Sequence, residues 1–469
     1  MRKFLSEIYV AELQSKRLHS IGTASIPRLI LLFSIPAIIS MSVEALYNVV
    51  DRYFVGMGVG YLGIAGITLC FPIMIFIMAM SMMIGIGGNT LFAIRLGQKK
   101  YSQSALILNN SFALLVLIAV FVFVFGQIFM EPLLRSFGAS NETLPYATGY
   151  MRIILFGAVF STVTPGMNNF IRSMGHPKTA MFRTLIGAGC NVFFDWLFIM
   201  KFGWGIAGAA WATVLSQFVA SLFVMSFFLQ KETPIKISLR YMRLKMPYVR
   251  RIFIMGLPPS LMQLCNSLMN VILNKSLFFY GNQSPYGGDM AISAFGIVNG
   301  IALMMVMPVI GFVQGVQPII GYNYGAKSFD RVRKTLKYAL GYSVAFMCGA
   351  WCLIQFQSEW LVGFFARDNV LLTTLASKSI RVFLLALPMI GIGMICGNFF
   401  QGTGKPGRAL ILNMCRQVLI LIPLLLIIPR FVGLKGVFMA APIADTAAAM
   451  LSIFLLMLEL RHMRAIEAR

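Results

Sequence analysis

Long apolar segments alternate with short polar breaks along the whole chain. The hydrocarbon core of a bilayer is about 30 Å thick, and an α-helix needs about 20 apolar residues to cross it. Only helices and closed barrels satisfy all their backbone hydrogen bonds in hydrocarbon. The pattern therefore predicts an all-α integral membrane protein with twelve spans. They run approximately over residues 28–53, 62–94, 104–130, 143–172, 180–200, 205–230, 248–280, 289–320, 335–357, 370–402, 408–430 and 433–460.

The polar stretches divide the chain into two tails, two halves and a linker. Residues 1–27 and 462–469 are expected to be the tails. The longest internal polar stretch, at 231–247, lies between the sixth and seventh spans. We therefore predict an N-lobe of six spans over 28–230 and a C-lobe of six spans over 248–461, joined by this linker.

The two halves carry the same motifs at a nearly constant separation. NFIRSMGHPKTA at 169–180 aligns with NFFQGTGKPGRA at 398–409, and LGQKKYS at 96–102 aligns with YGAKSFD at 324–330. Both copies of each motif are expected on the same side of the membrane, so the repeats are parallel and not inverted. Two parallel six-helix lobes around a central cleft are typical of transporters.

Basic residues indicate the orientation of the chain. Of its 39 Lys and Arg residues, 29 lie at the tails and at alternate breaks, against five at the other breaks. Cytoplasmic loops carry such an excess, so both termini are expected in the cytoplasm, as an even number of spans requires. The same placement explains the net charge of +24 without a nucleic-acid partner. We expect a multi-pass monomer in the cytoplasmic (inner) membrane, in contact with the lipid bilayer.

Composition excludes several classes of protein. A hydrophobic share of 58%, a charged share of 12% and a mean hydropathy of +0.81 are not those of a soluble protein. The three histidines are far apart and lie in tails or breaks, so a His-based metal or acid–base site is not expected. The seven cysteines include no CxxC pair, and there is no P-loop. We expect neither an enzyme nor a resident cofactor.

Acidic residues are rare within the spans, and the first span carries two of them. Glu44, Asn48 and Asp51 are spaced by four and three residues, so their side chains share one face of a helix. A carboxylate in hydrocarbon is costly unless it is paired, protonated or hydrated. The pattern indicates a proton or cation site. The alternatives are a hydrated Asp51 at the outer end of the span and a structural pair between Glu44 and an Arg or Asn.

The fifth span carries a third acid. Asn191 and Asp195 lie four residues apart on one helix face, although Asp195 could also lie at an outer helix end and bond to backbone. Two acids that face one cavity would titrate as a coupled pair. Nearby spans offer groups that could bond a buried carboxylate, namely Tyr150, Asn168 or Asn169, and Thr213.

The second half offers one further carboxylate. Asp445 lies well inside the last span, and Arg416 lies early in the eleventh. The two residues either form an ion pair or leave Asp445 to anchor a cationic substrate. The 32 methionines suit either an adaptable cavity or helix packing, and prolines within spans, such as Pro36, give places to bend.

Several stretches together resemble one transporter family. The chain is similar to the MATE (multidrug and toxic compound extrusion) transporters, in the prokaryotic branch of DinF-like and MepA-like exporters. The order and spacing agree in both halves. The matching stretches are Pro36 with LYNVVDRYFVG, then GIAGITLCFPI, RLGQKKYS, MGHPKTA, NVFFDWLF, GIAGAAWATVLSQ, GVQPIIGYNYGAKSFDRVRK and FQGTGKPGRA.

The resemblance implies a two-lobe, twelve-helix fold that opens alternately to each side and exchanges protons or Na⁺ for amphiphilic, often cationic compounds. Pro36 matches a proline at which the first span is thought to bend. Glu44 is not part of the family pattern, and the seventh span lacks the carboxylates typical of the NorM-like branch. A cation-coupling network maps to Asp51, Tyr150, Asn168, Asn191, Asp195 and Thr213, with Na⁺ conceivable at Asp51, Asn191, Asp195 and Thr213.

The sequence thus predicts a secondary active exporter that antiports bulky organic compounds against H⁺ or Na⁺. The alternative within transport is a flippase for lipid-linked oligosaccharides or other lipids, which calls for a cationic cleft. An integral membrane transferase would need clustered His or Asp at a membrane face, and the sequence shows none.

Overall fold

A computed structural model describes residues 21–467 except 60, 138–140, 142, 231–232, 234, 239–241 and 364–369. The predicted N-terminal tail therefore lies largely outside the described residues, as does part of the linker, whereas residues 462–467 of the predicted C-terminal tail belong to the last helix. The described residues form helices and no strands, which confirms the predicted all-α class. The helices are α2 (Ile26–Val59), α3 (Tyr61–Gly97), α4 (Tyr101–Ser136), α5 (Leu144–Phe156), α6 (Ala158–Ser173), α7 (Pro177–Asp195), η1 (Trp196–Lys201), α8 (Gly205–Leu229), α9 (Met246–Asn282), α10 (Gly288–Gly325), α11 (Phe329–Gly363), α12 (Val370–Phe383), α13 (Leu387–Gly402), α14 (Pro406–Met414), η3 (Cys415–Leu421), α15 (Ile422–Val432) and α16 (Leu434–Glu467).

Among the described residues, ten helical segments are long and apolar enough to cross a membrane, and two bent helix pairs bring the number to as many as twelve. The bent pairs are α5 with α6, at 53°, and α12 with α13, at 48°. Gly157 separates the first pair, and Pro388 is the second residue of α13 in the other pair. The two bends fall at corresponding places of the two halves, so the internal repeat extends to the irregularities of the spans.

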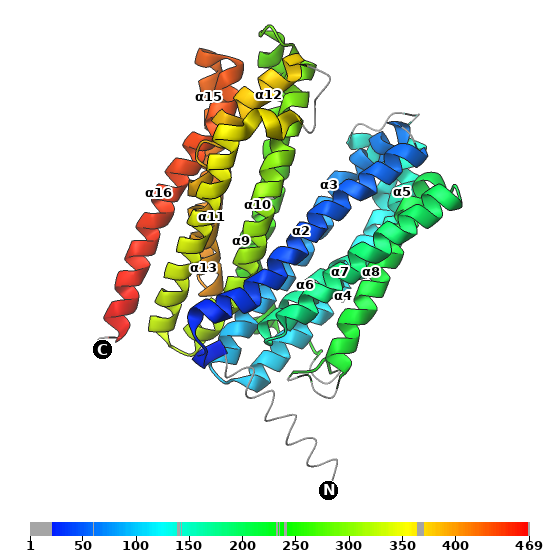
Figure 1. Cartoon of the computed structure of the whole chain (residues 1–469). Coiled ribbons are helices and arrows are strands. Elements are labelled where there is room, and N and C mark those ends of the chain that lie inside the picture. The colour runs from blue at the N-terminus through cyan, green and yellow to red at the C-terminus, as the bar shows by residue number, and fades with distance from the viewer. Residues whose placement is uncertain are drawn as a thin grey trace.

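The helices form two bundles that meet at one end (Figure 1). Helices α2–α8 make up one bundle and α9–α16 the other, and the bundles diverge toward the far end. The start of α2 and the end of α16 lie at the end where the bundles converge, named here the terminal end. One large cluster of buried apolar side chains fills the second bundle, and two smaller clusters fill the first. We refer to the first bundle as the N-lobe and to the second as the C-lobe.

Helix α2 belongs to both lobes. Leu29 and Phe33, near its start, pack into the apolar cluster of the C-lobe, whereas Val55, near its end, packs into a cluster of the N-lobe. Pro36 lies between these two parts. Proline removes a backbone hydrogen bond from a helix and favours bending at that point. The first span is therefore a direct mechanical link between the lobes.

Glycines allow the two lobes to touch closely at the terminal end. A Cβ atom added at Gly256 of α9 would lie 1.6 Å from the carbonyl oxygen of Met83 on α3, and one at Gly311 of α10 would lie 2.6 Å from that of Ala37 on α2. Such distances are possible only without a side chain. As in other membrane proteins, small residues let helix backbones approach each other.

Candidate functional site

The carboxyl groups of Asp51 and Asp195 meet between α2 and α7. The two carboxyl groups lie within interaction range of each other, and Asp195 is completely buried. Neither carboxylate oxygen of Asp195 accepts a hydrogen bond from a donor group of the described residues. Two carboxyl groups at this range can share one proton through a hydrogen bond, so the pair can hold a proton. If both groups are ionised, a cation must balance them.

The local helix geometry places Asp195 at this point. Helix α7 ends at Asp195, and the chain continues as the π-helical turn η1. A π-turn inserts an extra residue into the helix and is frequent at functional sites. Asn191 lies one turn earlier on α7 and is 2% exposed, yet neither atom of its amide group has a partner among the described residues. Carboxylate and amide oxygens are the ligands that hard cations prefer.

Tyr150 and Thr213 adjoin this carboxyl pair. Tyr150 is buried, lies within electrostatic range of Asp51 and shares a hydrogen bond with Thr213. The hydroxyl of Thr213 donates to the carbonyl of Ala209 at 3.1 Å. The structure thus brings Asp51, Asp195, Tyr150 and Thr213 into one neighbourhood, with Asn191 beside them.

Asn168 does not reach this neighbourhood. Its amide nitrogen donates to the carbonyl of Ala180, at 3.2 Å, in the first turn of α7. Ala180 precedes Asp195 by 15 residues, roughly 22 Å along a helix axis. The expected role of Asn168 as a direct partner of the carboxyl pair therefore does not fit the geometry. Asn169 bonds only within its own helix, to the carbonyl of Pro165 at 3.3 Å.

Glu44 lies nearer the terminal end than Asp51 and has different neighbours. Its carboxylate is within electrostatic range of two arginines, Arg183 of α7 and Arg172 of α6. Arg172 is only 4% exposed, and its Nη1 donates to Oε1 of Gln314 in the C-lobe at 2.8 Å. Glu44 therefore belongs to a second charged group, separate from the carboxyl pair. The side chain of Asn48, which was expected on the same helix face, lies outside the described residues.

Tyr47 lies between the carboxyl pair of Asp51 and Asp195 and the charged group around Glu44. The sequence analysis did not identify it, although its spacing from Glu44 and Asp51 places all three on one face of the helix. It lies within electrostatic range of Glu44, Asp51, Asp195 and Arg183. Its phenol lies on α2 between the two acidic positions of the span.

Asp445 forms a polar network within the C-lobe. Its Oδ1 accepts a hydrogen bond from Nε of Arg416 at 2.5 Å. Nη1 of Arg416 donates to Gln417 at 3.2 Å, and Gln417 donates to Asn266 of α9. Of the two alternatives for Asp445, the structure shows the ion pair. Arg416 and Gln417 lie in the π-helical turn η3.

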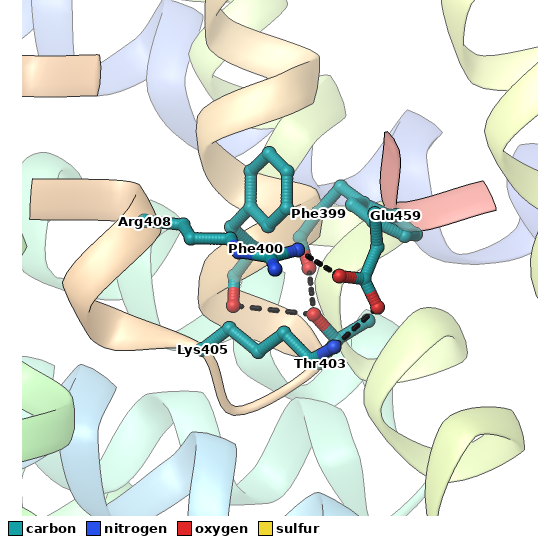
Figure 2. Close-up of polar contacts among 6 residues, drawn as sticks. All are labelled: Phe399, Phe400, Thr403, Lys405, Arg408 and Glu459. Carbon is teal, nitrogen blue, oxygen red and sulfur yellow. Dashed lines mark hydrogen bonds and ion pairs between the residues drawn. The ribbon is translucent and has the colours of Figure 1, made fainter. Parts of the chain in front are cut away.

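Glu459 has two cationic partners, which the sequence analysis did not find (Figure 2). This fully buried carboxylate of α16 pairs with Lys405 and Arg408, at the turn between α13 and α14. Arg408 also lies over the ring of Phe400, with its guanidinium carbon 5.8 Å from the ring centre. The motif GTGKPGRA reads as a loop with exposed charges, and no signal in it reveals a partner 51 to 54 residues away.

Comparison with known proteins places the chain among transporters. The family model MatE matches residues 36–197 and 258–427. The chain is 28% identical to the multidrug export protein MepA of Staphylococcus saprophyticus, over 95% of this chain and 97% of that protein. It is 26% identical to MepA of Staphylococcus aureus, over 90% and 92%.

Solved structures share the fold over almost the whole chain. One is an outward-facing conformation of a multidrug resistance MATE family transporter of the MOP superfamily, with 25% identity and a TM-score of 0.89 over 95% of this chain and 98% of the other. A second is a MATE protein in the bent conformation, with 25% identity and a TM-score of 0.89 over 97% and 99%.

Proposed function

The chain belongs to the MatE family of multi-pass membrane transporters, and on this premise we propose that it exports organic compounds in exchange for a cation bound at Asp51 and Asp195. Multidrug export by its relatives supports efflux as the transport activity. One observation carries the cation site. The carboxyl groups of Asp51 and Asp195 lie together, and neither carboxylate oxygen of Asp195 accepts a hydrogen bond from another described residue.

Electrostatics makes this pair sensitive to a cation. Two carboxylates in contact repel each other strongly where water is scarce, and either a proton or a Na⁺ ion removes the repulsion. Both ions are compatible with the oxygen-rich surroundings of Asp51, Asn191, Asp195 and Thr213. The coupling ion is itself transported and is not a resident cofactor. The side chains named above supply its binding site.

The path from the site to the lobes runs through α2. Asp51 lies on the part of α2 that packs in the N-lobe, and the part before Pro36 packs in the C-lobe. A cation that alters the contact between Asp51 and Asp195 therefore acts on the helix that joins the lobes. It shifts the equilibrium between two lobe arrangements only by its differential affinity for them.

The available driving force is adequate for this exchange. One charge moved across the membrane yields about 2.3 kcal/mol per 100 mV, and one pH unit adds about 1.4 kcal/mol per proton. The excess of basic residues at alternate breaks supports cytoplasmic termini. With the terminal end in the cytoplasm, the lobes diverge toward the outside, and amphiphilic organic cations are the substrates that fit acidic groups in the N-lobe.

The test is gradient-driven export by purified protein in proteoliposomes. Efflux of tetraphenylphosphonium is measured with a proton gradient alone and with a Na⁺ gradient alone, for wild type and for Asp51→Asn and Asp195→Asn. We expect both variants to bind the probe and to lose export driven by the coupling gradient. The matched control is Asp289→Asn, which changes an exposed carboxylate in the first turn of α10.

Undiminished gradient-driven export by Asp51→Asn would remove the carboxyl pair from the mechanism. Lipid headgroup translocation without efflux of the probe would favour the flippase alternative instead. Loss of export in the control as well would show that the assay reports protein quality and not coupling.

A further inference from the structure

Arg172 is a buried cation at the boundary between the lobes. It lies near the end of α6 and is 4% exposed, although the sequence places it beside a polar break. A buried arginine requires partners for its charge and its donors. Its Nη1 donates to Gln314 of α10 at 2.8 Å, so one of these partners belongs to the opposite lobe.

Gln314 also contacts α2. Its Nε2 lies 3.5 Å from the sulfur atom of Met41. Met41 and Glu44 are three residues apart on α2 and therefore share one face. Gln314 thus holds Arg172 beside α2, one helical turn from Glu44. The electrostatic interaction of Glu44 with Arg172 and Arg183 agrees with this placement.

We propose that Arg172 is a tethered cation that competes with a cationic substrate for Glu44, and that Gln314 positions it for this role when the lobes meet at the terminal end. This inference rests on the proposed export function. Arg172 and Gln314 are positioning residues, and Glu44 is the group that touches the substrate.

The arrangement gives a direction to transport. When the lobes separate at the terminal end, Gln314 moves away with the C-lobe and Arg172 loses the acceptor that holds it. Glu44 then keeps Arg183 of its own lobe as a neighbour, and an organic cation from the cytoplasm can take the place of Arg172. When the lobes meet again, Gln314 returns Arg172 to Glu44 and the substrate is expelled outward. The affinity for the substrate thus differs between the two arrangements, as alternating access requires.

The inference predicts that removal of the competing cation tightens binding. Binding of tetraphenylphosphonium to purified protein in nanodiscs, without any gradient, should become about tenfold tighter in Arg172→Gln, which corresponds to about 1.4 kcal/mol. In proteoliposomes, the same variant should show a lower KM and a lower kcat, because release slows. Arg172→Lys keeps the charge and should restore much of the wild-type behaviour.

A matched pair of variants separates this role from simple lobe contact. Gln314→Leu removes the acceptor of Arg172, and Gln317→Leu removes a different hydrogen bond between the lobes, from Gln317 to Thr90 at 3.2 Å. Each variant removes one hydrogen bond between the lobes, and of the two only Gln314→Leu removes a bond to Arg172. We expect tighter binding in Gln314→Leu than in Gln317→Leu, and this comparison remains available if Arg172→Gln does not fold.

A double-mutant cycle identifies the group for which Arg172 competes. In a Glu44→Gln background, Arg172→Gln should no longer tighten binding. Three results would each overturn the inference: persistence of the full effect in the Glu44→Gln background, equal effects of Gln314→Leu and Gln317→Leu, or weaker binding in Arg172→Gln. Because these measurements need no gradient, they stand apart from the Asp51→Asn export test, which can fail or succeed on its own.

Discussion

Gly256→Ala tests the contact between the lobes most directly. The added Cβ would lie 1.6 Å from the carbonyl oxygen of Met83, whereas carbon–oxygen contacts are about 3.3 Å or longer. Helices α3 and α9 must therefore move apart by about 1.7 Å at this level. A gap of about 1 Å already forfeits up to half of the dispersion attraction between contacting atoms. The lobes should meet less often at the terminal end, and export should fall while the substrate still binds.

Hydrogen–deuterium exchange measures this opening on the intact protein. Peptides that cover the facing parts of α3 and α9 should exchange faster in Gly256→Ala, and export of tetraphenylphosphonium should decrease in parallel. The control is Gly349→Ala in α11, where an added Cβ meets no atom within 4 Å. Unchanged exchange at α3 and α9 in a folded Gly256→Ala protein would refute the closely packed lobe contact.

Two stability predictions concern the buried ion pairs, with unfolding temperature in detergent as the measurement. Glu459→Gln removes a buried carboxylate from two partly exposed cations and should cost more than Glu131→Gln, which breaks an exposed pair and should cost at most about 1 kcal/mol; similar losses would contradict the burial argument. Arg416→Met should destabilise by about 3–5 kcal/mol because it strands the carboxylate of Asp445, and adding Asp445→Leu should recover most of the loss. A double variant no more stable than Arg416→Met would refute a simple charge-pair explanation.

The fold could be predicted from the sequence because the membrane imposes a strong one-dimensional pattern. Each predicted span corresponds to one long helix or to adjoining helical pieces, and the two halves repeat. Prolines within spans indicated places where a helix could bend, but they did not predict which spans would be broken. The spans at 143–172 and 370–402 read as continuous apolar stretches, but each is broken into two helices. Apolar composition reports length and burial, and it does not report the direction of the helix axis.

The acidic site residues could be recognised because carboxylates are rare in apolar spans. Asp51 and Asp195 meet, as the coupled-pair hypothesis requires. Asn168 was assigned to the same network by resemblance, yet its bond to Ala180 holds it near the other end of α7. A shared motif gives the residue type at a position, whereas the distance between two positions depends on how the helices are bent and packed.

By itself, the sequence determined the class, the spans, the repeat and the acids that hydrocarbon makes costly, because these follow from the free energy of transferring each residue out of water. Only the tertiary structure decided which charges meet. Arg172 counts as a loop charge in the sequence, but it lies buried against Gln314, 142 residues further along the chain. Pairing of this kind depends on the packing of whole helices, and α2, shared between the lobes on either side of Pro36, shows that even the lobe to which a span belongs is settled by packing.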